Sequence, residues 1–457
     1  MNSHKKGLAP RWLTAVFMFI ISSVLIVLTY IVDIVGAFYY YLVILIALLL
    51  WVFVDNQLPE NLGFKLKSWW WLQLILGILI GATVIGLFIW LEAILGWIIL
   101  TPIFLTIPLE EVIGWLITYA IWQGLVATTE ELVFRGYIQQ NLATSLFNPI
   151  AIFTTALMFA ITHIPSMIWN AVPLINAGIW FLNLTLGGIL LGIAFTRTKK
   201  LWLPIGIHFG WNFMQYHIAG FRDEGIISVH NLAPDILTGG AVGPEAGFIG
   251  TLAFITLIAV IWAFTQTYDG NLLEGFQRKP LILFLFGFLI VAVPACWGLI
   301  ISGLGLFLII WLVFLVVFLQ VWENRILCSH CPYYGKEGRV LRCHGNYGLY
   351  KLWKYNPGPM NRSERIQFII GVVVIFGYPF PFLIWSQQWL LLAFTSLGAI
   401  GLATILFGWL CLRCVNFSCP FNRVPKNAVD EFLRQNPEMK KAWQATGYKV
   451  EPERKTD

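Results

Sequence analysis

Long apolar runs dominate this sequence and limit the folds that it can adopt. A helix of about 20 apolar residues is long enough to cross the hydrocarbon core of a bilayer. Because 58% of the 457 residues are hydrophobic and only 11% are charged, the chain has more apolar surface than a soluble domain could bury. The runs predict an all-α, polytopic membrane bundle of about twelve transmembrane helices. These helices are expected at 12–32, 36–54, 69–92, 112–140, 149–167, 172–197, 202–219, 247–267, 281–300, 302–321, 367–386 and 389–410.

One further apolar segment is too short and too interrupted to be counted among these helices. Residues 93–111 contain Pro102 and Pro108, and proline interrupts a helix because it lacks the backbone N–H. We expect this segment to lie at the membrane interface or to form a re-entrant loop.

The distribution of basic residues indicates an orientation. If the N-terminus is cytoplasmic, all of the 29 Lys and Arg residues except Arg222 fall at cytoplasmic ends and loops of the predicted helices. They include Lys5 and Lys6 before the first helix and Lys67 after the second. The positive-inside rule predicts such a division. We therefore expect a multi-pass protein of the cell membrane, in contact with membrane lipids, with both termini in the cytoplasm.

The stretch TTEELVFRGYIQQNL, beginning at Thr128, places three charges near the end of the predicted helix 112–140. Charges at membrane depth are costly and usually mark functional sites. Glu131 and Arg135 are four residues apart, so they share one face of a helix and can form an ion pair. Glu130 points about 100° away from Glu131 and cannot easily share that partner. An incompletely compensated carboxylate suits a general base; alternatively, the three charges only pair with one another.

The following apolar segments supply candidate partners for these charges. Phe159 and His163 share a face of the fifth predicted helix, and His208 and Asn212 share a face of the seventh. A single intramembrane histidine more often forms a hydrogen bond between helices, but two histidines beyond a Glu-Glu pair indicate a site. One glutamate and two histidines can activate a water directly or around a divalent metal ion. An asparagine can donate a hydrogen bond to an oxyanion.

In order, spacing and helical context, the motifs E-E-x-x-x-R, F-x-x-x-H and H-x-x-x-N resemble those of the CPBP family. Its members are CAAX-prenyl-protease-like, or Abi-type, intramembrane endopeptidases related to the eukaryotic type II Ras-converting CAAX protease. The resemblance covers roughly 110–220 and implies a helical fold with a membrane-embedded cavity open to one side. It also implies that Glu131 and Arg135 order the catalytic site.

The resemblance assigns the remaining roles and implies a peptide or protein substrate, prenylated in the eukaryotic relatives. Glu130 would activate water with the help of His163, and His208 and Asn212 would stabilise the oxyanion. Whether the site works with a divalent metal or as a glutamate-type protease stays open. At 1.5 Å per residue, Glu130, His163 and His208 lie about 15, 21 and 9 Å from the predicted cytoplasmic ends of their helices. Either helix tilt and shifted helix starts bring them to one depth, or one of the predicted boundaries is wrong.

Cysteines gather in the half of the chain that the resemblance does not cover. Six of the seven lie in polar segments beside predicted helices: Cys328, Cys331, Cys343, Cys411, Cys414 and Cys419. Two predicted helices separate the two groups, so both are expected on the cytoplasmic face. Paired C-x2-C motifs are typical of structural zinc and of iron–sulfur sites. Disulfides are disfavoured in the cytosol. We expect a zinc or iron–sulfur site; alternatively, the thiols are free or lipidated.

The sequence thus predicts four parts: N-terminal transmembrane helices in 1–109, a catalytic core in 110–220, further transmembrane helices in 221–321, and Cys-rich cytoplasmic segments around two helices in 322–457. The basic, aromatic segment between the cysteine groups is expected to contact lipid headgroups rather than nucleic acid. Two alternatives to a protease are a membrane redox or transport protein centred on the cysteine site and a non-catalytic scaffold.

Overall fold

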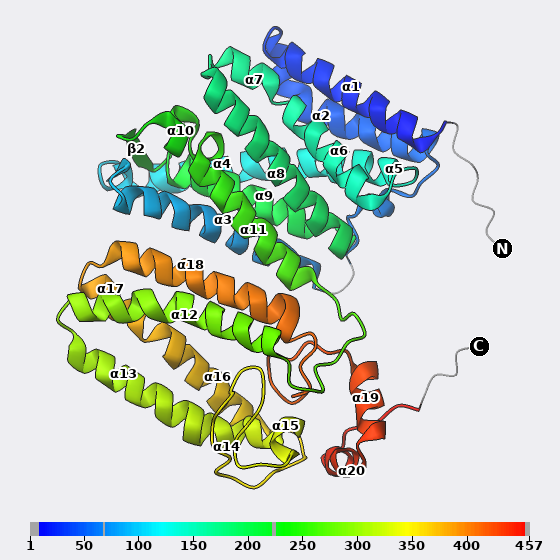
Figure 1. Cartoon of the computed structure of the whole chain (residues 1–457). Helices are drawn as coiled ribbons and strands as arrows, with labels where there is room; N and C mark the ends of the chain where they lie inside the picture. Colours follow the sequence, from blue (N-terminus) through cyan, green and yellow to red (C-terminus); the bar gives the residue numbers. More distant parts are fainter. Residues whose placement is uncertain (1–8, 67–68, 222–224, 453–457) are drawn as a thin grey trace. The chain divides into compact units, whose positions relative to one another are not determined.

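The computed structural model describes residues 9–66, 69–221 and 225–452, which form two compact units, Met1–Trp262 and Ala263–Asp457 (Figure 1). Helices dominate both units, so the predicted all-α polytopic fold is confirmed. The basic residues Lys5, Lys6, Lys67 and Arg222, on which the orientation partly rests, lie outside the described residues.

Within the described part of the chain, ten helical spans are long and apolar enough to cross a membrane, and they match ten of the predicted segments. They are Arg11–Thr29, Trp70–Ile94, Leu109–Leu142, Asn148–Trp169, Leu174–Thr198, Phe248–Thr265, Arg278–Ile301, Gly305–His330, Arg362–Trp385 and Trp389–Leu410. The predicted segments 36–54 and 202–219 are helical too, but the described apolar part of the first is shorter and the second is largely buried by its neighbours.

The first unit contains the three motif segments. Its helices and strands are α1 (Arg11–Thr29), α2 (Asp33–Leu49), η1 (Leu50–Val54), η2 (Pro59–Leu62), α3 (Trp70–Ile94), β1 (Ile98–Pro102), η3 (Ile103–Leu105), α4 (Leu109–Glu131), η4 (Leu132–Gln139), α5 (Gln140–Leu142), α6 (Asn148–Ile161), α7 (Ile164–Trp169), α8 (Leu174–Thr198), α9 (Trp202–Asn212), η5 (Phe213–Ile218), β2 (Ile227–Asn231), α10 (Asp235–Thr238), η7 (Gly240–Val242), η8 (Pro244–Ala246) and α11 (Phe248–Thr265).

Glycines bring α3 and α9 together along most of α9. Gly77 and Gly81 on α3 face Gly206 and Gly210 on α9, each pair spaced four residues apart. A Cβ added at Gly210 would lie 2.3 Å from the carbonyl oxygen of Ile78, so no side chain fits there. Small residues at this spacing allow membrane helices to approach until their backbones touch. The backbone of α3 therefore fixes the position of α9.

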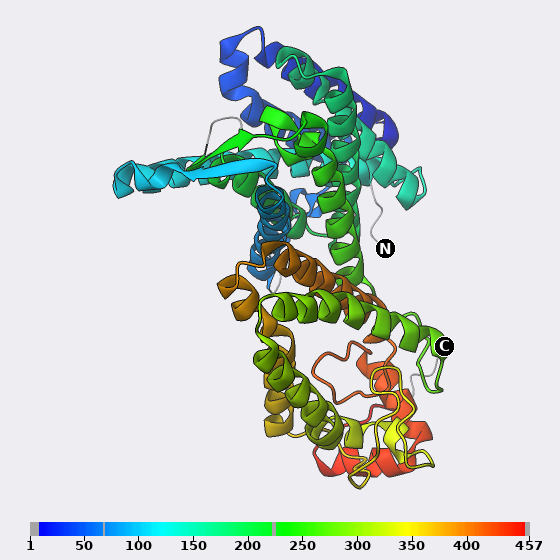
Figure 2. The ribbon, with the colours of Figure 1, turned by 60° about the vertical axis from the view of Figure 1, so that its left-hand side comes forward.

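A small antiparallel sheet, which the all-α prediction did not foresee, occupies part of the segment 93–111. β1 pairs with β2 so that Ile98 lies opposite Asn231 and Pro102 lies opposite Ile227 (Figure 2). β-Branched residues favour a strand here, and the prolines prevent the chain from continuing as a helix. The expected interfacial location of this segment stays a prediction.

A buried polar network fixes the first helices of this unit to the end of the motif helix. Asn141 of α5 accepts a hydrogen bond from Arg11 at 2.7 Å and donates one to Asp55 at 2.9 Å. Asp55 also accepts from the hydroxyl of Thr14 at 3.0 Å. Buried polar groups are costly unless they are paired. The network therefore holds α1 and the segment after η1 at fixed positions against α5.

The second unit is a helical bundle followed by the cysteine-rich segments. Figure 1 shows α12 beside α18 and α13 beside α16. Its elements are α12 (Arg278–Ile301), α13 (Gly305–Val317), η9 (Phe318–Glu323), α14 (Asn324–Ile326), η10 (Cys328–His330), α15 (Pro332–Gly335), α16 (Arg362–Gly377), α17 (Pro379–Trp385), α18 (Trp389–Ile405), η11 (Leu406–Leu410), α19 (Lys426–Gln435) and α20 (Pro437–Ala445). The predicted division into four parts at 109, 220 and 321 stays a prediction.

Candidate active site

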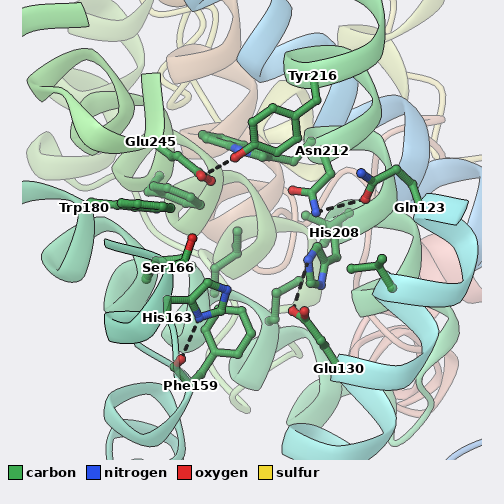
Figure 3. Close-up of a pocket in the computed structure, with 18 of the residues that line it drawn as sticks. Gln123, Glu130, Phe159, His163, Ser166, Trp180, His208, Asn212, Tyr216 and Glu245 are labelled. Atoms are coloured by element: carbon green, nitrogen blue, oxygen red, sulfur yellow. Dashed lines mark hydrogen bonds and ion pairs between the residues drawn. The ribbon is translucent and has the colours of Figure 1, made fainter. Parts of the chain in front are cut away.

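The three sequence motifs meet at one pocket in the first unit, although they lie on separate helices (Figure 3). Its volume is about 290 Å³, and Glu130 from α4, Phe159 from α6, and His208 and Asn212 from α9 line it. His163, between α6 and α7, lines it too. Five of the seven predicted catalytic residues thus share one cavity.

Glu131 and Arg135 do not line this pocket but form the predicted ion pair beneath it. The Arg135 guanidinium donates to Glu131 Oε1 at 2.7 Å, and both side chains are completely buried. Arg135 also donates to the carbonyl of Gly188 at 3.4 Å and lies over the ring of Phe159, 4.8 Å from its centre. A buried charge needs such a partner, since water cannot solvate it. The ion pair therefore helps to hold Phe159, which lines the pocket, in position.

His208 connects this buried pair to the pocket. Its Nδ1 lies 2.9 Å from Glu131 Oε1, and its Nε2 lies 3.7 Å from Glu130 Oε2. Because an ionised carboxylate can only accept, Nδ1 carries the proton that is donated to Glu131. Nε2 then faces Glu130 and the pocket. The two adjacent glutamates consequently have different environments: Glu131 is fully buried, whereas the side chain of Glu130 is 20% exposed.

His163 lies at a break between two helices rather than inside one helix. α6 ends at Ile161, and Pro165 lies in the first turn of α7. At this break the His163 backbone N–H donates to the carbonyl of Ala160, so the carbonyl of Phe159 is available to the imidazole. The imidazole Nδ1 donates to it at 2.9 Å. This hydrogen bond assigns the proton to Nδ1 and leaves Nε2 as an acceptor.

Asn212 is oriented by a residue that the motif analysis missed. Its amide donates to Oε1 of the buried Gln123 at 3.3 Å, and Gln123 Nε2 lies 2.9 Å from Nε2 of His217. The ring of His217 stacks on Tyr119, with 4.1 Å between the ring centres. The spacing could have revealed Gln123, because it lies seven residues, or two helical turns, before Glu130 on the same helix face.

Further polar residues line the pocket on the side away from Glu130 and come from regions outside the motifs. Tyr216 donates a hydrogen bond to the carboxylate of Glu245, and both lie in the pocket wall beside Trp180 (Figure 3). The Asn183 amide donates to the backbone carbonyls of Glu245 and Gly247 and so fixes this loop. No sequence pattern marks Glu245 as a pocket residue, because its position depends on the fold of residues 239–247.

The pocket contains three residues that could bind the predicted divalent metal ion. Glu130, His163 and His208 are residue types that bind zinc, and all three line the pocket. Among the residues that the structure describes, no three His, Cys, Asp or Glu side chains are grouped closely enough to hold one metal ion. A divalent metal in the core therefore stays a prediction.

The six predicted cysteine ligands lie in the second unit and have free thiols. Cys328 and Cys331 are buried, while Cys343, Cys411 and Cys414 are partly buried, as is Cys419. The two C-x2-C segments lie side by side, because the Asn416 amide donates to the carbonyl of Leu327 at 3.1 Å.

Comparison with known proteins identifies the part of the chain that contains the three motifs. Residues 111–214 match the family model described as type II CAAX prenyl endopeptidase, Rce1-like. Neither the curated proteins nor the solved structures gave a match. The matched residues include Glu130, His163, His208 and Asn212, and the resemblance drawn from the motifs is confirmed.

Proposed function

Residues 111–214 make this chain a member of the Rce1-like family of CAAX endopeptidases, and on that premise we propose that it hydrolyses a peptide bond with a water activated by Glu130. The observation that carries the proposal is the environment of Glu130. Its carboxylate faces the pocket, 3.7 Å from Nε2 of His208, while the adjacent Glu131 neutralises Arg135. Glu130 is thus the carboxylate of this pair that can bind and deprotonate a water.

In the proposed reaction, Glu130 takes a proton from the water while the water oxygen attacks the scissile carbonyl. Nε2 of His163 accepts a second hydrogen bond from the same water and orients it, because its Nδ1 already donates to Phe159. The amide of Asn212 donates one hydrogen to Gln123 and has a second for the oxyanion. Glu130 then returns the proton to the leaving amine, so the carboxylate is regenerated.

His208 would act as the second oxyanion group. Protonated His208 donates from Nε2 into the pocket, and Glu131 stabilises the imidazolium through Nδ1 at 2.9 Å. Preorganised donors of this kind stabilise charge that develops in the transition state, typically by about 3–4 kcal/mol for each donor. Removing His208 should therefore lower the rate of cleavage more than it lowers substrate affinity.

The substrate would be a peptide or protein tail in the membrane, as the family description suggests, and we include prenylated tails in the proposal. Large aromatic residues line the pocket beside the catalytic groups, among them Tyr40, Trp122, Trp211 and Phe254. Such walls suit an apolar chain attached near the scissile bond.

The test is cleavage of internally quenched peptides by the purified chain in detergent, with matched peptides that do or do not carry a prenylated C-terminal cysteine. Glu130→Gln should abolish cleavage without changing the thermal unfolding midpoint. Glu111→Gln, on the exposed surface of the same helix, is the matched control and should cleave normally. Cleavage by Glu130→Gln at the wild-type rate would refute the role of this carboxylate. A transport function would instead predict that Glu130→Gln loses proton flux in liposomes.

The metal requirement and the orientation are tested separately. If a divalent metal serves the core, Glu130→Ala with His163→Ala should lower the metal content of the pure protein and chelation should stop cleavage; a glutamate-type site predicts neither.

We also propose that both termini are cytoplasmic, because the basic residues lie at the corresponding helix ends. Protease added to intact cells should leave tags on both termini intact, and cleavage of either tag would refute this orientation.

A further inference from the structure

The four long helices of the second unit form two pairs that meet at one end and spread apart at the other (Figure 1). α12 lies beside α18, and α13 lies beside α16. At the end where the pairs meet, Leu299 of α12 and Trp311 of α13 belong to one buried hydrophobic cluster. The Trp311 indole also donates to the carbonyl of Ile375 in α16 at 3.0 Å. The pairs diverge toward the cysteine-rich segments (Figure 2).

A cavity of about 260 Å³ lies where the two pairs diverge, and all four helices line it. Phe368, Val372 and Phe376 follow one another at intervals of four residues, so they form one face of α16 in the cavity wall. Because each residue of a helix rises 1.5 Å, this row of side chains extends for about 12 Å along α16. Further apolar residues of the wall are Phe284, Phe288, Leu315, Leu402 and Leu406.

The size and the length of this cavity fit one hydrocarbon chain. An apolar cavity of about 150 Å³ stays free of water and binds benzene, whose ring has six carbon atoms. In proportion, about 260 Å³ holds about ten carbon atoms. About ten carbon atoms spread over about 12 Å correspond to an extended chain and not to a compact ring. The lipids around membrane-spanning helices supply such chains.

Part of the cavity wall is polar. The Glu323 carboxylate lies in the wall and accepts a hydrogen bond from the side-chain amide of Asn346 at 3.0 Å. His344, two residues before Asn346, lines the cavity as well. The His344 Nε2 accepts a hydrogen bond from the backbone N–H of Gln277 at 3.1 Å, so the imidazole proton is on Nδ1. The wall thus combines an acceptor, the Glu323 carboxylate, with a donor, the His344 imidazole.

These polar groups decide which lipid the cavity selects. A hydrocarbon chain gains little when it leaves the bilayer, because lipid tails are as apolar as leucine side chains. A hydroxyl head group can donate to Glu323 and accept from His344, and both hydrogen bonds are strong in surroundings of low dielectric constant. A carboxylate head group would place a second acid beside Glu323, which is unfavourable.

We propose that this cavity binds a neutral single-chain lipid, with about ten carbon atoms of its chain between the helix pairs and a hydroxyl head group beside Glu323 and His344. The lipid site lies entirely in the second unit, so it is independent of the proposed peptidase chemistry in the first unit. The zinc or iron–sulfur site that the sequence predicts at the cysteines does not depend on the lipid and stays a prediction.

The experiment uses the full-length protein in phosphatidylcholine nanodiscs and, as the probe, 1-decanol with a photoreactive diazirine at the end of its chain. After illumination, mass spectrometry should find the label on cavity residues such as Phe376 and Leu402, and excess 1-decanol should prevent it. Val372→Phe fills the cavity and should lower this labelling about tenfold. Val373→Phe is the matched control and should be labelled like the wild type, because Val373 is exposed on the same helix.

A second probe tests the head group. Decanoate with the same diazirine should label the cavity residues of the wild type about tenfold less than the decanol probe does. Glu323→Gln should remove this difference, because it replaces the acidic neighbour by a neutral side chain that can still accept from Asn346.

Three results would overturn the proposal. One is decanol labelling that is confined to side chains on the lipid-exposed surface. Another is labelling of the cavity at the wild-type level in Val372→Phe. The third is equal labelling of the wild type by the two probes, which would refute the hydroxyl head group. A misfolded variant is recognised by its thermal unfolding midpoint, and Leu406→Phe, which fills the cavity from η11, then replaces Val372→Phe.

Discussion

Arg135→Met tests whether the buried ion pair supports the site. Arg135 and Glu131 are fully buried and 2.7 Å apart, and removing one member of such a pair typically costs about 3–5 kcal/mol because the other charge stays buried and unpaired. The variant also loses the hydrogen bond to Gly188 and the contact with the ring of Phe159. We expect the free energy of unfolding to fall by about 3 kcal/mol, the lower end of this range, because His208 still donates to Glu131 at 2.9 Å.

The assay is reversible unfolding in mixed micelles, followed by tryptophan fluorescence, for the wild type, both single variants and the double variant Glu131→Gln with Arg135→Met. In the double variant no charge is stranded, so most of the lost stability should return. Two results would refute the reasoning: a change within about 0.5 kcal/mol for Arg135→Met, or a double variant whose loss equals the sum of the single losses.

The other predictions concern the packing that positions these residues. Gly210→Ala should lower peptide cleavage by about 100-fold, because its Cβ would lie 2.3 Å from the carbonyl oxygen of Ile78 and displace the helix that carries two catalytic groups. Gly86→Ala, whose Cβ would meet only a flexible methionine side chain at 3.5 Å, should cleave like the wild type. Asn141→Leu should lower the free energy of unfolding by about 1–3 kcal/mol, because it leaves Asp55 buried without its amide donor; unchanged unfolding in micelles would contradict this.

Local spacing predicted the contacts that lie within one helix. The four-residue interval from Glu131 to Arg135 gives their ion pair directly, because the helical period places both side chains on one face. Phe159 and His163 also meet, with 4.7 Å between their ring centres, although a helix break lies between them. Contacts of this range depend mainly on local backbone geometry.

Contacts between side chains of separate segments could not be predicted from the sequence, because they depend on how the helices pack. Counting from the predicted cytoplasmic ends of the helices placed Glu130, His163 and His208 at different depths, yet they line one pocket. Tilt and the starting level of each helix follow from packing against neighbours, which no single segment encodes. For the same reason Glu245 was missed, since its position in the pocket wall depends on a loop held by Asn183.

The glycine contact between α3 and α9 also limits the route by which a substrate can arrive. Backbones that touch leave no side chain that can rotate aside, so a substrate cannot pass between α3 and α9 unless the two helices separate. A substrate therefore has to enter through another part of the pocket wall. Tyr40 of α2 and Trp122 of α4 form an edge-to-face pair in such a part of the wall.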